Sequence, residues 1–407
     1  DAFDALADGI RADLDSDGLQ KLVAEAVDSG TAGELWQPLA TLLSDVVTAP
    51  SDDKWRQQIL MVLGRIQAER LLFHEDARTT FEKVLAIDPG ALEALDVLES
   101  IAMQQQDFTA LEGVLIRRID ALKLDSDRQV VLVRLGALYE DLIGDDEKAA
   151  AAFARAAELA AEPDRAVLAG LHRTYDRLER FPELADVIRK ERLLAPQDWE
   201  RIALDIELAA VLADGLGQFD DALAVLDGIL CDADNDKALA LVRRIFDDGS
   251  DTDTAGSILR TVYARTGDSA GLLGVIETMI ERAGRNDAKA ALLVQAAGIL
   301  SADLGDPSGA FERLASSIRL FPTEENVTLA LGLAQEVDGF RLLADAIQSV
   351  VDPDVAAAED LPELDPEIQA LLFGTLGNLY GRKLGQPGKA VMAMERVMAL
   401  TDVDESF

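Results

Sequence analysis

The chain has 407 residues, 76 of them acidic and 38 basic, so its formal net charge at pH 7 is −38. Nucleic-acid phosphates and anionic membrane surfaces would be repelled by this charge, which excludes both as expected partners. The charge favours a basic partner protein, or it keeps a long scaffold in solution. Hydrophobic residues make up 49% and aromatic residues 5%, which is typical of closely packed helices. No stretch approaches the roughly eighteen consecutive apolar residues of a membrane span.

The N-terminal residues 1–17 are expected to form a helix that ends an upstream repeat, in a chain that is a piece of a longer protein. Asp13, Asp15 and Asp17, followed by Gly18, match the first half of a calcium-binding loop. The second half does not match, because Ala24 stands where a bidentate glutamate is needed. We therefore favour an Asp-rich cap for the next helix over a metal site.

A long helical hairpin is predicted five times along the chain, and each copy carries an alanine near the start of its second helix. These alanines are spaced by 72 to 88 residues. Because a gap near 72 is about two repeats of the usual 34-residue length, a second hairpin must lie between successive copies. The copies and their alanines are 63–89 (Ala77), 135–161 (Ala149), 208–230 (Ala222), 296–318 (Ala310) and 376–398 (Ala390).

The second copy shows the long hairpin most clearly. Its first helix is expected to end near Ile143, and its second helix is expected to run from Glu147 to about Ala160. Small residues allow the two helices to approach closely, while aromatic rings fill the volume beside them. The residues that form this pattern are Leu135, Gly136, Tyr139, Ala149, Phe153 and Ala156.

The intervening short hairpin contains an aromatic-x-x-Leu motif. The motif begins at Trp36, Phe108, Phe181 and Phe340, and a weaker copy without the ring begins at Ser269. In four of these copies the leucine precedes the next hairpin's alanine by the same 38 residues. The chain is thus predicted to contain five two-hairpin units, or about ten hairpins and twenty helices.

The small and aromatic residues of the long hairpin resemble the tetratricopeptide repeat (TPR) signature, with one extra residue before the alanine. The alternation of two hairpin types is similar to that of long bacterial arrays of this kind. The resemblance implies an all-α, right-handed α-solenoid of antiparallel hairpins that binds other proteins and is not an enzyme.

Two departures from the repeat register are expected. Residues 231–254 form an insertion with a short helix from Lys237 to Phe246, and residues 351–366 form a Pro- and Asp-rich linker. The repeats then cover 18–350, and the last hairpin covers 367–407. The insertion is a candidate binding surface through Arg243, Arg244 and Phe246, unless its apolar residues pack on the neighbouring hairpins.

No catalytic, cofactor or metal-binding constellation is found in the sequence. His74 and His172 are the only histidines and belong to different units, so they do not form a metal cluster. Cys231 is the only cysteine, and no histidine lies near it in sequence to activate it.

The first helices of the long hairpins are expected to line a small apolar groove suited to an apolar helix or peptide. The alternative is that these residues pack against the neighbouring short hairpins and form no groove. The groove candidates are Met61, Arg65, Val133, Ala137, Glu140, Ile206, Ala210, Val294, Gly298, Gly374 and Asn378.

The leading interpretation is a non-catalytic scaffold for protein–protein interaction that uses this surface. One alternative is a regulatory or substrate-presenting region of a larger enzyme. Another is a structural rod at the cell surface that is stiffened by calcium.

Overall fold

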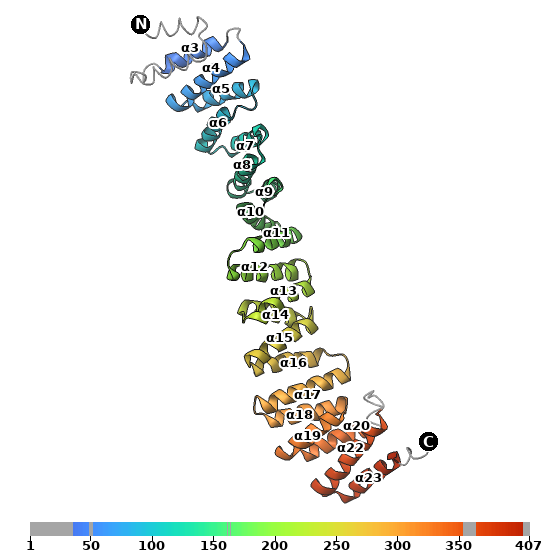
Figure 1. Ribbon diagram of the computed structural model, residues 1–407. Coiled ribbons are helices and arrows are strands. Elements are labelled where there is room, and N and C mark those ends of the chain that lie inside the picture. The colour runs from blue at the N-terminus through green and yellow to red at the C-terminus, as the bar shows by residue number, and fades with distance from the viewer. Residues whose placement is uncertain (1–35, 49–51, 161, 163, 353–363, 402–407) are drawn as a thin grey trace. The chain divides into compact units, whose positions relative to one another are not determined.

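The computed structural model describes residues 36–48, 52–160, 162, 164–352 and 364–401. Over these ranges every regular element is helical, with twenty α-helices and four π-helical turns, as predicted for an array of TPR-like hairpins (Figure 1). Among the described helices, none has the length and apolar character to cross a bilayer. The expected N-terminal helix, the partial calcium loop and most of the 351–366 linker lie outside the described residues.

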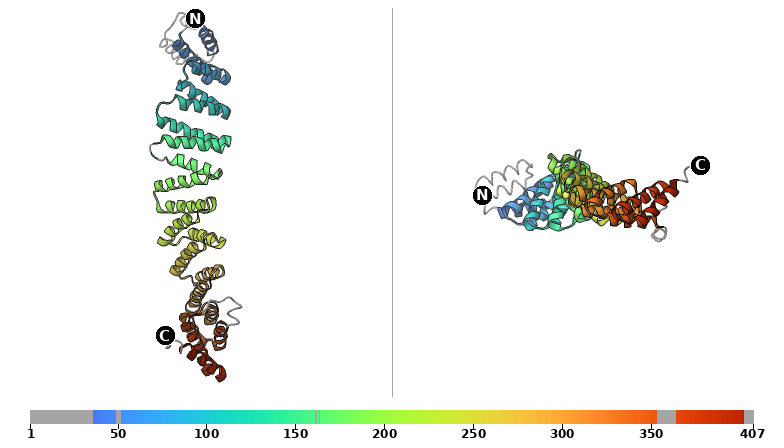
Figure 2. Two further views of the ribbon diagram at one scale, coloured as in Figure 1. Left: turned by 90° about the vertical axis from the view of Figure 1, so that its right-hand side faces the viewer. Right: turned by 90° about the horizontal axis from the view of Figure 1, so that it is seen from below.

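The described helices fall in two compact units, Asp1–Val211 and Leu212–Phe407. Within each unit, neighbouring helices pack side by side in chain order (Figure 2). The helices of the first unit are α3 (Trp36–Val47), α4 (Asp53–Arg65), η2 (Ile66–Arg70), α5 (His74–Ile87), α6 (Leu92–Gln105), α7 (Phe108–Ala121), α8 (Asp125–Leu138), η3 (Tyr139–Ile143), α9 (Asp146–Leu159), α10 (Arg165–Arg177), α11 (Phe181–Leu194) and α12 (Asp198–Ala210).

A π-helical turn, η4 (Val211–Gly215), lies where the two units meet in sequence. The remaining helices are α13 (Phe219–Asp232), α14 (Asp236–Asp248), α15 (Thr252–Thr266), α16 (Ser269–Arg282), α17 (Asn286–Ala302), α18 (Pro307–Leu320), α19 (Glu324–Glu336), α20 (Phe340–Val351), α22 (Pro366–Asn378), η5 (Leu379–Lys383) and α23 (Pro387–Thr401).

The extra residue in the long-hairpin pattern is accommodated by a wider turn at the end of the first helix. In the 135–161 hairpin, the amide of Gly144 donates to the carbonyl of Tyr139, five residues earlier, and the amide of Asp145 donates to the same carbonyl. A bond across six residues recurs at the equivalent place in all five long hairpins. A π-helical turn adds one residue without breaking the helix, which explains the departure from the usual spacing.

The aromatic-x-x-Leu motif begins a helix in each of its five copies. Trp36, Phe108, Phe181 and Phe340 are the first residues of α3, α7, α11 and α20, and Ser269 is the first residue of α16. The leucine of each aromatic copy is buried, because it lies one turn into the helix on the side of the hairpin core.

The alanines of the first four long hairpins are fully buried, and in the first two of these hairpins a glycine on a neighbouring helix makes room for an aromatic ring. A Cβ atom added at Gly136 or at Gly170 would lie 2.7 Å from the Phe153 ring. That ring therefore lies between α8 and α10, at a distance that only glycine permits.

The last long hairpin differs from this pattern. Ala390 is only half-buried, and Met394, at the position of the aromatic ring, is exposed. The reason is that α23 packs on α22 and η5, and no described helix covers its other side.

The turn of each long hairpin contains a residue with left-handed backbone. In four hairpins this residue is Gly144, Gly217, Gly305 or Gly385, but in the first it is Leu72, with φ of 56°. A left-handed conformation costs a residue with a Cβ about 1–2 kcal/mol, and Leu72 is 66% exposed, so packing does not offset this cost.

We therefore expect Leu72→Gly to raise the free energy of unfolding by about 0.5–1 kcal/mol, because it removes this strain. Urea denaturation followed by circular dichroism measures the change. The reciprocal change, Gly144→Ala, should lower stability by about 1 kcal/mol. A Leu72→Gly variant less stable than the natural chain would mean that the leucine makes a stabilising contact.

Candidate interaction surfaces

Most of the residues predicted to line a groove on the first helices are half-buried or paired with other residues of their own unit. In the first unit Met61 and Val133 pack against the hydrophobic cores, and Arg65 forms an ion pair with Glu93 at 2.6 Å. In the second unit Val294 packs against the core, and the Asn378 amide donates to a carbonyl of its own helix. Ala137, Ile206, Ala210 and Gly374 are half-buried, and only Gly298 is exposed without a close neighbour.

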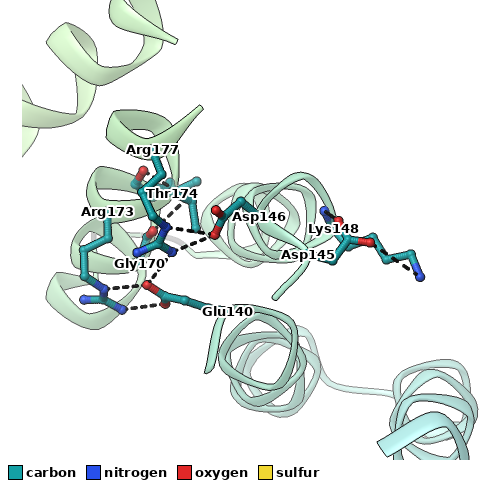
Figure 3. Close-up of polar contacts among 9 residues, drawn as sticks. Glu140, Asp145, Asp146, Lys148, Gly170, Arg173, Thr174 and Arg177 are labelled. Carbon is teal, nitrogen blue, oxygen red and sulfur yellow. Dashed lines mark hydrogen bonds and ion pairs between the residues drawn. The ribbon is translucent and has the colours of Figure 1, made fainter. Parts of the chain in front are cut away.

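Glu140, another groove candidate, is the centre of the polar cluster in Figure 3. Its side chain is 5% exposed and accepts two hydrogen bonds of 2.8 Å from the guanidinium of Arg173. Arg177 donates to the same carboxylate at 2.9 Å and also contacts Asp146. Hydrogen bonding from Arg173 lowers the pKa of Glu140 to about 2. The carboxylate thus links η3 to α10, Arg177 extends the link to Asp146 on α9, and the carboxylate is already occupied by these contacts.

Glu140 is one member of a set of ion pairs that join neighbouring hairpins. The partners of these pairs are 28 to 37 residues apart, close to the length of one hairpin. Members of the set are Arg78–Asp107, Arg117–Glu82, Lys148–Glu112, Arg165–Glu200, Arg180–Glu147, Arg244–Asp214, Arg265–Asp234 and Arg313–Glu277. Many of the chain's few basic residues are therefore committed to contacts within the array. The only signal of these pairs in the sequence is the recurring spacing of basic and acidic residues, because the side chains meet only when the helices stack.

His172 makes a similar link on α10. Its Nδ1 lies 2.6 Å from a carboxylate oxygen of Glu191 on α11, and its Nε2 lies 3.1 Å from one of Glu207 on α12. Hydrogen bonds to these two carboxylates, with Glu191 as the larger cause, raise the pKa of His172 to about 10 from 6.5. The imidazole is therefore protonated at neutral pH and donates one hydrogen bond from each ring nitrogen.

We expect this link to stabilise the first unit by about 1–2 kcal/mol at pH 6 and to be lost in alkali. Because the folded pKa lies above the unfolded one, the contribution is complete below pH 6.5 and disappears as the pH rises through about 10. Proton NMR of the imidazole checks the titration directly. The stability difference between the natural chain and His172→Gln should shrink from pH 6 to pH 10.5, and a constant difference would contradict the assignment.

The insertion contains the predicted helix, α14, but its apolar face is not available to a partner. Leu241, Val242, Ile245 and Phe246 are buried against the neighbouring helices, so Phe246 was wrongly predicted as a binding residue. The physical reason is that these residues recur at helical spacing and α13 and α15 cover them. Arg282 also closes the helix end by donating to the carbonyl oxygens of Phe246 and Asp247.

Of the two arginines of this helix, Arg243 is half-buried and Arg244 is exposed, and both are paired. Arg243 contacts Asp247 one turn later at 3.2 Å, and Arg244 contacts Asp214 at 2.6 Å. Near the start of the insertion, Cys231 is exposed and Asp227 raises the pKa of its thiol. Across the described ranges, no group of three or more His, Cys, Asp or Glu residues is arranged to hold a metal ion.

The first long hairpin has an exposed apolar tip, formed by Leu72 and Phe73. Leu72 is 66% and Phe73 is 43% exposed. The other four turns read Gly144-Asp145, Gly217-Gln218, Gly305-Asp306 and Gly385-Gln386 at these two positions. Asp145 and Asp306 cap the following helix with their side chains, whereas Phe73 provides no side-chain cap for α5. This pair was not predicted, although it differs visibly in the sequence from the other four turns.

A cleft lies between α5 and α7 in the first unit. It consists of a cavity of 620 Å³ and a neighbouring one of 250 Å³. The ion pair between Glu82 and Arg117, 2.7 Å long, lies at the boundary of the two cavities. The cleft lies between the second helices of two hairpins, whereas the predicted groove was on the first helices.

No protein-family model matches the chain, and no curated protein matches it. Solved structures similar to it include that of Naa15/Naa10 bound to HypK-THB, at 13% identity over 95% of this chain and 73% of that one, with a TM-score of 0.28. Another is a tetratricopeptide repeat protein from Parabacteroides merdae, at 14% identity over 79% of this chain and 98% of that one, with a TM-score of 0.30. The TPR-like character of the fold follows from the helices of this chain and from their contacts.

Proposed function

We propose that the chain is a helical-repeat scaffold that binds another protein, and that the tip formed by Leu72 and Phe73 is part of the binding surface. The internal comparison of the five long-hairpin turns carries this proposal. At this one turn, a strained leucine replaces a glycine and a phenylalanine replaces a polar residue. Residues that reduce stability and leave apolar surface in water are typical of functional sites.

The surroundings of the tip favour a partner with an apolar pocket and a basic rim. Glu69, Glu75 and Asp76 are exposed beside Leu72 and Phe73, and none of the three forms an ion pair with a described residue. Large apolar side chains at the centre of a charged rim are the usual arrangement of a protein-binding surface. The net charge of −38 favours the same kind of partner.

The proposal is tested by a variant that takes the residues of the other turns, Leu72→Gly with Phe73→Asp. This variant should be more stable than the natural chain by about 1 kcal/mol or more, because it removes the strain and restores a helix cap. Affinity capture from the source cells, followed by quantitative mass spectrometry, should show that a protein retained by the natural chain is lost with the variant. Loss of binding together with increased stability excludes unfolding as its cause.

The matched control is Leu304→Ser, which removes an exposed leucine from the equivalent turn region of another long hairpin. It should retain the same protein as the natural chain. The proposal fails if the natural chain retains no protein above the background of the support, or if the turn variant retains the same proteins as the natural chain.

A further inference from the structure

We infer that the cleft between α5 and α7 is a second binding site, and that it receives a short cationic amphipathic helix from another protein. The inference rests on the proposed function only in that the array binds proteins, since it uses different residues from the tip of the first long hairpin. Its evidence is the shape of the cleft, an internal comparison with the equivalent helices of the second unit, and the charge at its edge.

The lining of the cleft includes apolar side chains, which we call its floor, together with charged side chains from α5 and α7. Leu85, Ala86 and Ala121 line the larger cavity, and Leu98, Ile101 and Val114 line the smaller one. Gly113 lies on the α7 side, where an added Cβ would meet no atom within 4 Å. The volume of the larger cavity, 620 Å³, is sufficient for large apolar side chains.

The equivalent space between α18 and α20 in the second unit is filled by side chains of the array itself. There α18 and α20 pack closely, and the residue after the buried alanine is Phe311, whose ring lies against Gly339 at the start of α20. In the first unit these two positions are Arg78 and Asp107, which form an ion pair at 3.4 Å.

The position five residues after the buried alanine of each hairpin differs in the same way. Ala315 is buried in α18, whereas Glu82 at the equivalent position of α5 is paired with Arg117 and remains 43% exposed. Ion pairs thus bridge the space between α5 and α7 without filling it. An apolar ridge from another helix would supply the contacts that Phe311 and Ala315 make in the second unit.

The charge at the cleft favours a cationic helix. Arg78 and Arg117 are already neutralised by Asp107 and Glu82. Asp120, at the edge of the larger cavity, is exposed and forms no ion pair with a described residue. A helix that places leucine in the cavity and lysine or arginine one turn away would satisfy both the apolar floor and this carboxylate.

The test uses three synthetic helical peptides of about fifteen residues, a length at which helices are marginally stable in water. One has a leucine ridge flanked by lysine, one has the same ridge flanked by glutamate, and one has the lysines with alanine in place of leucine. Fluorescence anisotropy with the purified full chain measures their affinities. Only the leucine–lysine peptide is expected to bind, with a Kd on the order of 10–100 µM.

Two variants locate the binding. Gly113→Trp fills the cleft and should weaken binding of the leucine–lysine peptide at least about tenfold. Asp120→Lys should weaken the same peptide about threefold or more and permit binding of the glutamate peptide. The matched control is Gly274→Trp at the equivalent position of α16, where an added Cβ also meets nothing within 4 Å. It should leave the affinity unchanged.

Circular dichroism measures whether each variant is folded. If Gly113→Trp does not fold, Asp120→Lys still tests the inference. The inference is overturned if the leucine–lysine peptide does not bind, or if Gly113→Trp binds it as the natural chain does. Equal binding of the alanine–lysine peptide would also overturn it, because attraction would then come from charge alone. None of these outcomes bears on Leu72 and Phe73, so failure here is distinguishable from failure of the proposed function.

Discussion

Replacing Phe153 with alanine is expected to lower the free energy of unfolding of the first unit by about 3–5 kcal/mol. The ring is 2% exposed and lies between Gly136 on α8 and Gly170 on α10. Its removal leaves a cavity that these helices cannot close without moving, so both the burial of the ring and its contacts are lost. Urea denaturation followed by circular dichroism measures the change.

Two further variants separate this effect from a general sensitivity of the unit. Ala149→Leu should lower stability by about 1–3 kcal/mol, because Ala149 is fully buried and the added atoms have no space. Trp199→Ala truncates an aromatic side chain that is largely exposed, and it should change stability by less than about 0.5 kcal/mol. If Phe153→Ala behaved like Trp199→Ala, the hairpin register would be wrong.

The second large effect is expected for Glu140→Gln, at about 2 kcal/mol of lost stability. The neutral amide cannot accept the paired hydrogen bonds of Arg173 as strongly, and Arg177 loses one of its two carboxylate partners. The cost stays below that of breaking a fully buried ion pair, because both arginines are about half-exposed and remain hydrated.

The pH dependence of this effect follows from the lowered pKa of Glu140. Because the folded pKa of about 2 is below the ordinary value of 4.5, the carboxylate contributes its full stability above pH 4.5 and loses it as the pH falls to 2. The difference between the natural chain and Glu140→Gln should therefore shrink in acid. Glu147→Gln is the control, since its ion pair with Arg180 is exposed and its removal should cost less than about 0.5 kcal/mol. Equal losses of stability in Glu140→Gln and Glu147→Gln would contradict the conclusion that the buried carboxylate of Glu140 contributes more than an exposed ion pair.

The helices and their order could be predicted from the sequence because they depend on local pattern. Apolar residues at helical spacing, alanines at fixed places and a constant distance of 38 residues indicate the hairpins. The insertion helix was predicted for the same reason, and α14 begins and ends within two residues of its expected bounds. Its exposure could not be predicted, because a lone amphipathic helix has the same sequence whether it is covered by neighbours or by a partner.

What the sequence by itself determined is thus an array of alternating long and short hairpins with an acidic surface. The tertiary structure decided which side chains meet across hairpins, since residues more than thirty positions apart become neighbours only when the helices stack. It showed that Glu140 is bound by Arg173 and that Phe246 is buried. It also revealed the strain at Leu72, because the backbone conformation of a turn depends on how the two helices it joins are packed.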